Sequence, residues 1–160
     1  MKTLIQKIIN IILRILYIIP IKNNQVICMN FNGKGFGESP KYIAEELLKR
    51  DNGIKIYWVV KDMKDATIPS KIKKVKYKSL HFFIILYTSK VIINDTRFGM
   101  YFNKRKEQFY IQTWHGCFAM KKIENDAIEK LPKNYYELMI HDSKMIDLIP
   151  SNSNFFNELC

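Results

Sequence analysis

Acidic residues are scarce in this sequence relative to basic ones. The 160 residues include 15 Asp and Glu against 26 Lys and Arg, which gives a formal net charge of +11. Such an excess points to an anionic partner: nucleic acid, an anionic membrane surface or a phosphate-rich substrate. Apolar residues are not scarce, since 48% of the chain is hydrophobic. That composition excludes a disordered chain and indicates one globular domain with its own core.

Cysteine is also rare. Cys28, Cys117 and Cys160 are odd in number and far apart, and the sequence contains no CxxC pair. This spacing argues against a disulfide framework or a zinc site, and it favours reduced thiols in a cytoplasmic protein. We therefore expect neither a metal ion nor a cofactor.

The sequence has no apolar run long enough for a membrane span. A helix over residues 4–19 would rise only about 24 Å, and no small-residue cleavage site follows it. Its only polar residues fall on one narrow stripe: Gln6, Lys7, Asn10 and Arg14. We expect residues 1–21 to form an amphipathic helix in the membrane interface, with its cations toward lipid headgroups. The alternative is an apolar helix packed on a partner domain.

After residue 21, short apolar runs alternate with helical patterns. Strands are expected at 25–30, 55–60, 73–78, 90–94, 108–113 and 145–149, and helices at 40–49, 79–88 and 133–144. The strand runs lack clean alternation of polar and apolar residues, which indicates a parallel sheet buried on both faces. The expected fold class is therefore α/β, with helices on both faces of the sheet.

Polar residues gather where the expected strands end. They are Asn30, Asn32, Asn94, Asp95, His115, Gly116, Ser151 and Asn152. In parallel sheets, ligands bind beyond the carboxyl ends of the strands, so this edge is the expected site. Loops are polar in most proteins, so the pattern alone does not define a function.

A glycine-rich turn follows the first expected strand. Gly33, Lys34 and Gly35 precede a helix, where backbone N–H groups and the helix dipole favour an anion such as phosphate. The turn is not a dinucleotide fingerprint, because Glu38 occupies the position of the third glycine. A plain tight turn would have the same composition.

A histidine between Trp114 and Gly116 ends the expected fifth strand. The imidazole of His115 is suited to deprotonating a hydroxyl group. Trp114 would form a wall of the site, and Gly116 would let a substrate approach the backbone. Lys121 and Lys122 would bind phosphate oxygens as point charges. The alternative is a loop histidine that only hydrogen-bonds the backbone.

Together these motifs resemble the amino-terminal half of the CDP-glycerol glycerophosphotransferases. These enzymes are teichoic-acid primases and polymerases of Gram-positive bacteria, with relatives in capsule synthesis. The resemblance is carried by four segments: Asn30-Phe-Asn-Gly33 with Ser39-Pro-Lys-Tyr42, Val91-Ile-Ile-Asn94, Tyr110-Ile-Gln-Thr-Trp-His-Gly116 and Lys121-Lys-Ile-Glu-Asn-Asp126. It implies that residues 22–160 form the Rossmann-like, acceptor-side domain of a GT-B fold. It also implies attachment to the cytoplasmic face of the cell membrane through the N-terminal helix.

The resemblance implies a reaction as well. A glycerol hydroxyl of a lipid-linked glycerol-phosphate acceptor attacks the β-phosphate of CDP-glycerol and releases CMP, without a cofactor. His115 would be the catalytic base. The residues expected to bind substrate or phosphate are Gly33, Lys34, Gly35, Asn94, Trp114, Gly116, Lys121, Lys122 and Asp126.

The sequence also departs from the family pattern. Cys117-Phe-Ala-Met120 stands where the family often has Thr-Pro before its lysine, which is closer to the capsule branch. Family members are more than twice this long, and their carboxyl-terminal domain holds most of the CDP-glycerol site. We therefore expect a truncated chain that is inactive alone.

Two other functions compete with this one. The first is a non-catalytic membrane-docking or regulatory half-domain. The second is nucleic-acid binding through the basic segment 71–78. Such a segment is more often a solvated strand face, and we expect no nucleic-acid partner.

Overall fold

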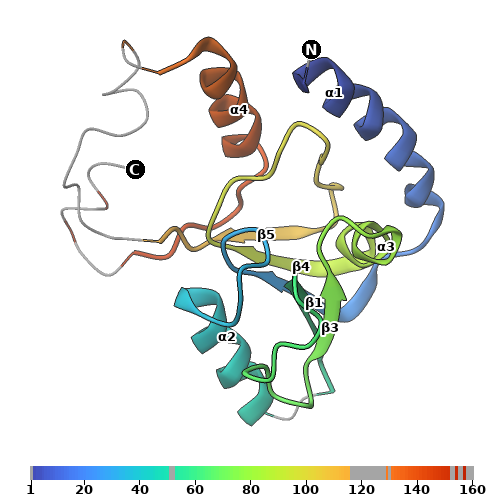
Figure 1. Ribbon diagram of the computed structural model, residues 1–160, viewed down its shortest axis with the longest axis vertical. Coiled ribbons are helices and arrows are strands. Elements are labelled where there is room, and N and C mark those ends of the chain that lie inside the picture. Colours follow the sequence, from blue (N-terminus) through green and yellow to red (C-terminus); the bar gives the residue numbers. More distant parts are fainter. Residues whose placement is uncertain are drawn as a thin grey trace.

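A single parallel sheet organises the chain (Figure 1). The computed structural model describes residues 2–50, 53–115, 129, 131–151, 154 and 157. The strands are β1 (Lys22–Met29), β2 (Lys55–Val60), β3 (Lys73–Lys76), β4 (Ser89–Asn94) and β5 (Phe109–Gln112). They lie in the order β3-β2-β1-β4-β5, and every neighbouring pair is parallel. This is the strand order of a Rossmann-like sheet, and the expected α/β class is confirmed.

Helices cover both faces of the sheet, as expected (Figure 1). Helix α2 (Glu38–Lys49) packs on one face, where Cys28 and Trp58 of the central strands are fully buried. Helix α3 (Leu80–Thr88) packs on the other face, against Ile27 and Ile92. Consecutive strand residues point to opposite faces, so both sides of each central strand must be apolar. This explains why the strand sequences do not alternate.

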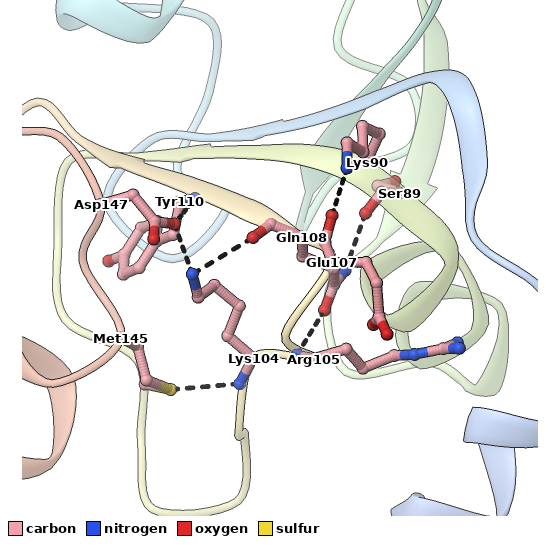
Figure 2. Close-up of polar contacts among 9 residues, drawn as sticks. All are labelled: Ser89, Lys90, Lys104, Arg105, Glu107, Gln108, Tyr110, Met145 and Asp147. Atoms are coloured by element: carbon pink, nitrogen blue, oxygen red, sulfur yellow. Dashed lines mark hydrogen bonds and ion pairs between the residues drawn. The ribbon is translucent and has the colours of Figure 1, made fainter.

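The prediction of a sixth strand at 145–149 is wrong. This segment forms only an isolated parallel bridge between Ile111 and Leu148. The reason is visible in Figure 2: the Asp147 carboxylate accepts the Tyr110 N–H at 2.7 Å and forms an ion pair with Lys104. A side chain thus takes the backbone donor that a longer strand ladder would use. Among the other strands, the boundaries that differ by two residues or more are the start of β1 at residue 22 and the end of β3 at residue 76.

The N-terminal segment forms α1 (Lys2–Leu13) and a 3-10 helix, η1 (Arg14–Ile18). Two polar side chains of α1 face the protein: Gln6 Oε1 accepts the Met100 N–H at 3.0 Å, and Asn10 Oδ1 accepts from Asn103 Nδ2 at 2.9 Å. The apolar residues face outward, and those on the exposed side include Ile8, Ile11, Ile12 and Ile15. In the described part of the chain, no helix is both long and apolar enough to cross a bilayer.

The segment between β4 and β5 rises between α1 and α4 (Lys133–Ser143) (Figure 1). On the α4 side, His141 Nε2 hydrogen-bonds the Phe102 carbonyl at 2.8 Å. On the α1 side lie the two contacts of Gln6 and Asn10. The first residues of this segment, directly after β4, belong to the candidate site.

Candidate active site at the switch point of the sheet

The strand order reverses between β1 and β4, and their carboxyl ends meet there. In open α/β sheets this is where ligands bind. Asn30 follows β1 and Asp95 follows β4, and both side chains are buried. The Phe31 N–H donates to Asp95 Oδ1 at 2.9 Å, which ties the two strand ends together.

His115 joins this point from β5. Its Nδ1 hydrogen-bonds the backbone carbonyl of Asp95 at 2.9 Å. A carbonyl oxygen only accepts hydrogen bonds, so Nδ1 must carry the proton. In the neutral ring, Nε2 then holds a free lone pair, and no group in residues 2–50, 53–115 or 131–151 hydrogen-bonds it. The side chain is exposed, so a substrate can reach this nitrogen.

Aromatic rings surround the imidazole. The Phe31 ring lies 5.2 Å from the His115 ring between centroids, and the Trp114 ring lies 5.3 Å away on an edge-on approach. The Arg97 guanidinium stacks over Trp114 at 4.6 Å and also donates to the Tyr135 hydroxyl at 2.6 Å. These contacts connect the histidine to α4 and fix the orientation of Trp114.

The backbone at this point is strained. Phe31, Asn32 and Gly33 have consecutive φ angles of 39°, 57° and 84°, and Trp114 has a φ of 57°. Residues other than glycine rarely adopt these angles, and such strain concentrates at functional sites. At Gly33 a Cβ would lie 3.1 Å from the Lys61 backbone nitrogen, so only glycine fits.

The electrostatics of Asp95 are unusual. Burial raises the pKa of its carboxyl group, while the Phe31 N–H and the nearby His115 act in the opposite direction. Within the described residues, Asp95 Oδ2 and Asn30 Oδ1 are buried without a hydrogen-bond partner. Buried polar atoms are normally paired. Both of these oxygens belong to residues that directly follow the two neighbouring strands β1 and β4.

The structure does not support every role expected from the sequence. The Asn94 side chain is buried and donates to the Thr96 carbonyl, which is a structural contact. The Gly33 and Lys34 N–H groups donate to the Asn30 carbonyl at 2.8 and 3.0 Å, so these two amides do not point at an anion. The Gly35 carbonyl accepts from Trp58 Nε1. The side chain of Lys34 is exposed and remains available from this turn.

Other expected residues cannot be placed. Gly116, Lys121, Lys122 and Asp126 lie outside the described residues. Of the cysteines, Cys28 is fully buried, and burial raises the pKa of its thiol to about 12, so it is not a reactive nucleophile. In the described part of the chain, no cluster of three or more His, Cys, Asp or Glu residues could hold a metal ion.

Sequence reasoning did not single out Phe31, Asp95 or Arg97. Phe31 and Arg97 resemble ordinary loop residues, and Asp95 was one of several polar residues at strand ends. Their importance depends on β1 and β4 being neighbours, which no local pattern shows. A signal did exist for Asp95, because an aspartate directly after a buried central strand lies at the carboxyl edge.

Comparison with known proteins defines the class. The structure is similar to the wall teichoic acid polymerase TagF, with a TM-score of 0.80 and 22% identity for one variant. It is also similar to unsubstituted TagF, with a TM-score of 0.75 and 24% identity. In both cases the match covers 98% of this chain and 42% of the other. These likenesses establish the fold, a Rossmann-like domain of the GT-B type.

The family model for CDP-glycerol:poly(glycerophosphate) glycerophosphotransferase matches residues 11–160, and the chain belongs to this family. A teichoic acid poly(glycerol phosphate) polymerase from Staphylococcus epidermidis is 31% identical over 106 residues, covering 66% of this chain and 15% of the relative. A polymerase of the same name from Bacillus subtilis is 26% identical over 146 residues, covering 88% and 19%. The chain thus spans less than a fifth of the length of these two relatives.

Proposed function

We propose that this chain is the acceptor-side part of a glycerophosphotransferase. The enzyme moves glycerol phosphate from CDP-glycerol to a hydroxyl of a membrane-linked glycerol-phosphate acceptor and releases CMP. Membership of the family supports this reaction. The single observation that carries it is the hydrogen bond from His115 Nδ1 to the Asp95 carbonyl, which leaves Nε2 as a proton acceptor.

In this mechanism, His115 Nε2 takes the proton of the acceptor hydroxyl as its oxygen attacks the β-phosphate. The bond from that phosphorus to the CMP oxygen breaks, and CMP leaves. The Asp95 carboxyl group interacts electrostatically with His115, so in its ionised form it would offset the positive charge that His115 gains. Lys34 and Trp114 contribute to substrate binding, as do Gly116, Lys121, Lys122 and Asp126 by resemblance. Catalysis rests mainly on positioning and charge, as in other phosphoryl transfers.

We also propose that α1 holds the protein on the cytoplasmic face of an anionic membrane. The isoleucines of α1 are exposed, with Ile11 and Ile12 67% and 63% accessible, while Gln6 and Asn10 of the same helix are bound to the protein. A soluble surface would normally show the reverse polarity. Lys7 and Arg14 are exposed on the same segment, and the net charge is +11. An anionic lipid surface fits both the apolar and the charged groups.

The test is His115→Ala in a chain joined to the remaining part of the enzyme. The rate of CMP release should fall about 10²–10⁴-fold, because a general base contributes that much. The melting temperature should change little, since the exposed ring makes one hydrogen bond. His141→Ala is the matched control, because His141 also binds a backbone carbonyl through one ring nitrogen. The His141→Ala variant should release CMP at the rate of the parent enzyme.

The alternative of a structural histidine predicts the opposite pair of results for His115→Ala. The melting temperature would drop clearly, and the rate would fall only in proportion to the unfolded fraction. A destabilised but fast enzyme would remove His115 from the mechanism.

A further inference from the structure

Two lysines flank one tyrosine at the carboxyl edge of the sheet. The Lys61 ammonium lies 5.9 Å from the Tyr77 ring centroid, and the Lys78 ammonium lies 5.2 Å from it. Lys61 directly follows β2, and Tyr77 directly follows β3. The Tyr77 N–H donates to the Val60 carbonyl at 2.7 Å, so the two strand ends are joined. The lysine pair therefore lies on the edge where His115 lies.

The position of these lysines is built into the backbone. Lys78 has a φ of 59°, a strained angle for a lysine, and its ammonium also lies 5.8 Å from the Tyr101 ring. Lys61 N–H donates to the Gly33 carbonyl at 2.8 Å. Both side chains are exposed, and in the described residues neither pairs with a carboxylate. Two unpaired cations around an aromatic ring are available to an external anion.

One turn connects this lysine pair to the candidate base. The Tyr77 hydroxyl donates to Asn32 Oδ1 at 3.0 Å, and the neighbouring Phe31 ring lies against the His115 ring. Both turn residues have left-handed backbone angles. The strained turn thus separates two parts of one edge, with the cations on the β2 and β3 side and His115 on the β5 side.

We propose that Lys61, Tyr77 and Lys78 form a subsite for phosphodiester groups of the acceptor chain. The subsite holds phosphates that lie behind the hydroxyl end, which reaches His115 across the turn. A glycerol-phosphate chain carries one negative charge per repeat, and lysines bind phosphate oxygens as point charges. The assignment of this ligand as the acceptor rests on the proposed function. The proposal that these three residues bind an anion does not depend on the proposed function.

Other lysines in this region have a simpler explanation. Lys73 and Lys76 lie on β3, which is an edge strand of the sheet. Charged side chains on an edge strand prevent pairing with other chains. That explanation does not cover Lys61, which follows an inner strand, or Lys78, which lies beyond the end of β3.

The test compares two double variants that remove the same charge. Lys61→Gln with Lys78→Gln removes the subsite. Lys55→Gln with Lys73→Gln removes exposed lysines from the opposite ends of β2 and β3, and Lys73 also lies over a tyrosine ring at 5.8 Å. Binding of a soluble glycerol-phosphate oligomer to the 160-residue chain is measured by titration calorimetry at several salt concentrations, after melting curves have verified the fold.

The subsite variant should bind the oligomer about five- to tenfold more weakly, which is the scale of two exposed charge contacts. The slope of log binding constant against log salt concentration should become shallower by about one to two. The control pair should change the affinity less than about twofold. An equal loss in both variants would show a net-charge effect and overturn the proposal.

Two further probes separate the sources of the anion. If inorganic phosphate bound the subsite as tightly as the oligomer does, the subsite would be a simple phosphate site. A loss confined to anionic lipid vesicles would assign it to lipid headgroups instead. Either result overturns an acceptor subsite. The two proposals can fail separately: CMP release that survives His115→Ala would refute the proposed function, while weaker oligomer binding by the Lys61 and Lys78 variant would still support the subsite.

Discussion

Asp142 carries a carboxyl group whose ionisation is strongly affected by the fold. It lies on α4 with only 1% of its surface exposed. The Phe98 N–H donates to its Oδ1 at 3.0 Å, while its Oδ2 has no partner among the described residues. Burial raises the pKa of its carboxyl group from 3.8 to about 6, and the Phe98 N–H and Arg97 only partly oppose this. The folded state therefore binds this proton more tightly than the unfolded chain does.

This pKa predicts how stability depends on pH. The favourable contribution of the protonated Asp142 is fully present below pH 4, and it is lost as the pH rises through about 6. Asp142→Asn removes the ionisation and keeps an acceptor for the Phe98 N–H. At pH 7.5 the variant should be more stable than the parent by about 1–3 kcal/mol, and the difference should shrink toward pH 4. Urea unfolding at several pH values measures it.

Asp147→Asn provides the contrast, because that carboxylate is ion-paired with Lys104 and accepts the Tyr110 N–H. This variant should be less stable than the parent at pH 7.5. If Asp142→Asn were also less stable there, the folded protein would stabilise the ionised Asp142 carboxylate, and its pKa would be lowered and not raised.

At the residue scale, sequence reasoning found His115 and Trp114 but not their partners. A histidine after a strand and before a glycine is a local pattern, so it can be recognised along the chain. Asp95 and Phe31 matter only because β1 and β4 are neighbours. Arg97 matters only because its loop returns to Trp114. Such contacts between distant residues are decided by topology and not by propensity.

At the scale of elements, most strands and helices were predicted because their apolar runs are long. The prediction of the sixth strand was wrong because the Asp147 carboxylate accepts the Tyr110 N–H. A side chain that competes with backbone hydrogen bonds leaves no periodic pattern in the sequence. Helix α1 was predicted as amphipathic, but its orientation was not predictable. Gln6 and Asn10 hydrogen-bond the loop around Met100 and Asn103, which leaves the isoleucines of α1 outward.

The orientation of α1 changes how its membrane role should be tested. Deleting residues 1–20 would also remove Leu16 and Tyr17, which pack against the core, so a loss of binding could reflect unfolding. Ile8→Asp with Ile12→Asp changes only exposed positions, which are 49% and 63% accessible. This variant should lose most flotation with anionic vesicles, because two charges enter the lipid-facing side.

Leu80→Asp is the matched control for that variant. Leu80 is an exposed apolar residue at the start of α3, with 71% of its surface accessible. Its replacement should leave flotation unchanged if α1 is the membrane contact. Equal flotation of the Ile8 and Ile12 variant and the parent would show that this side of α1 does not bind lipid.

At the scale of the whole molecule, the groups of the proposed site lie along one edge of the sheet. His115 Nε2 and the lysine pair at Tyr77 lie on the same carboxyl edge, at different strands. In the proposed function, the described domain supplies the acceptor-side surface: the base His115, the cations at Tyr77 and a helix that contacts the membrane. It offers no comparable set of groups for a nucleotide, since the amides of Gly33 and Lys34 are used within their own turn.

This division predicts the activity of the chain alone. The chain covers 42% of the similar TagF structures, and in the proposed function the donor CDP-glycerol is held mainly by the remaining part. Purified 160-residue protein should therefore release no measurable CMP from CDP-glycerol, even with an acceptor present. The assay should be run beside a chain joined to the remaining part, which should be active. Turnover by the 160 residues that disappears on His115→Ala would instead place the donor site, together with the base, within this domain.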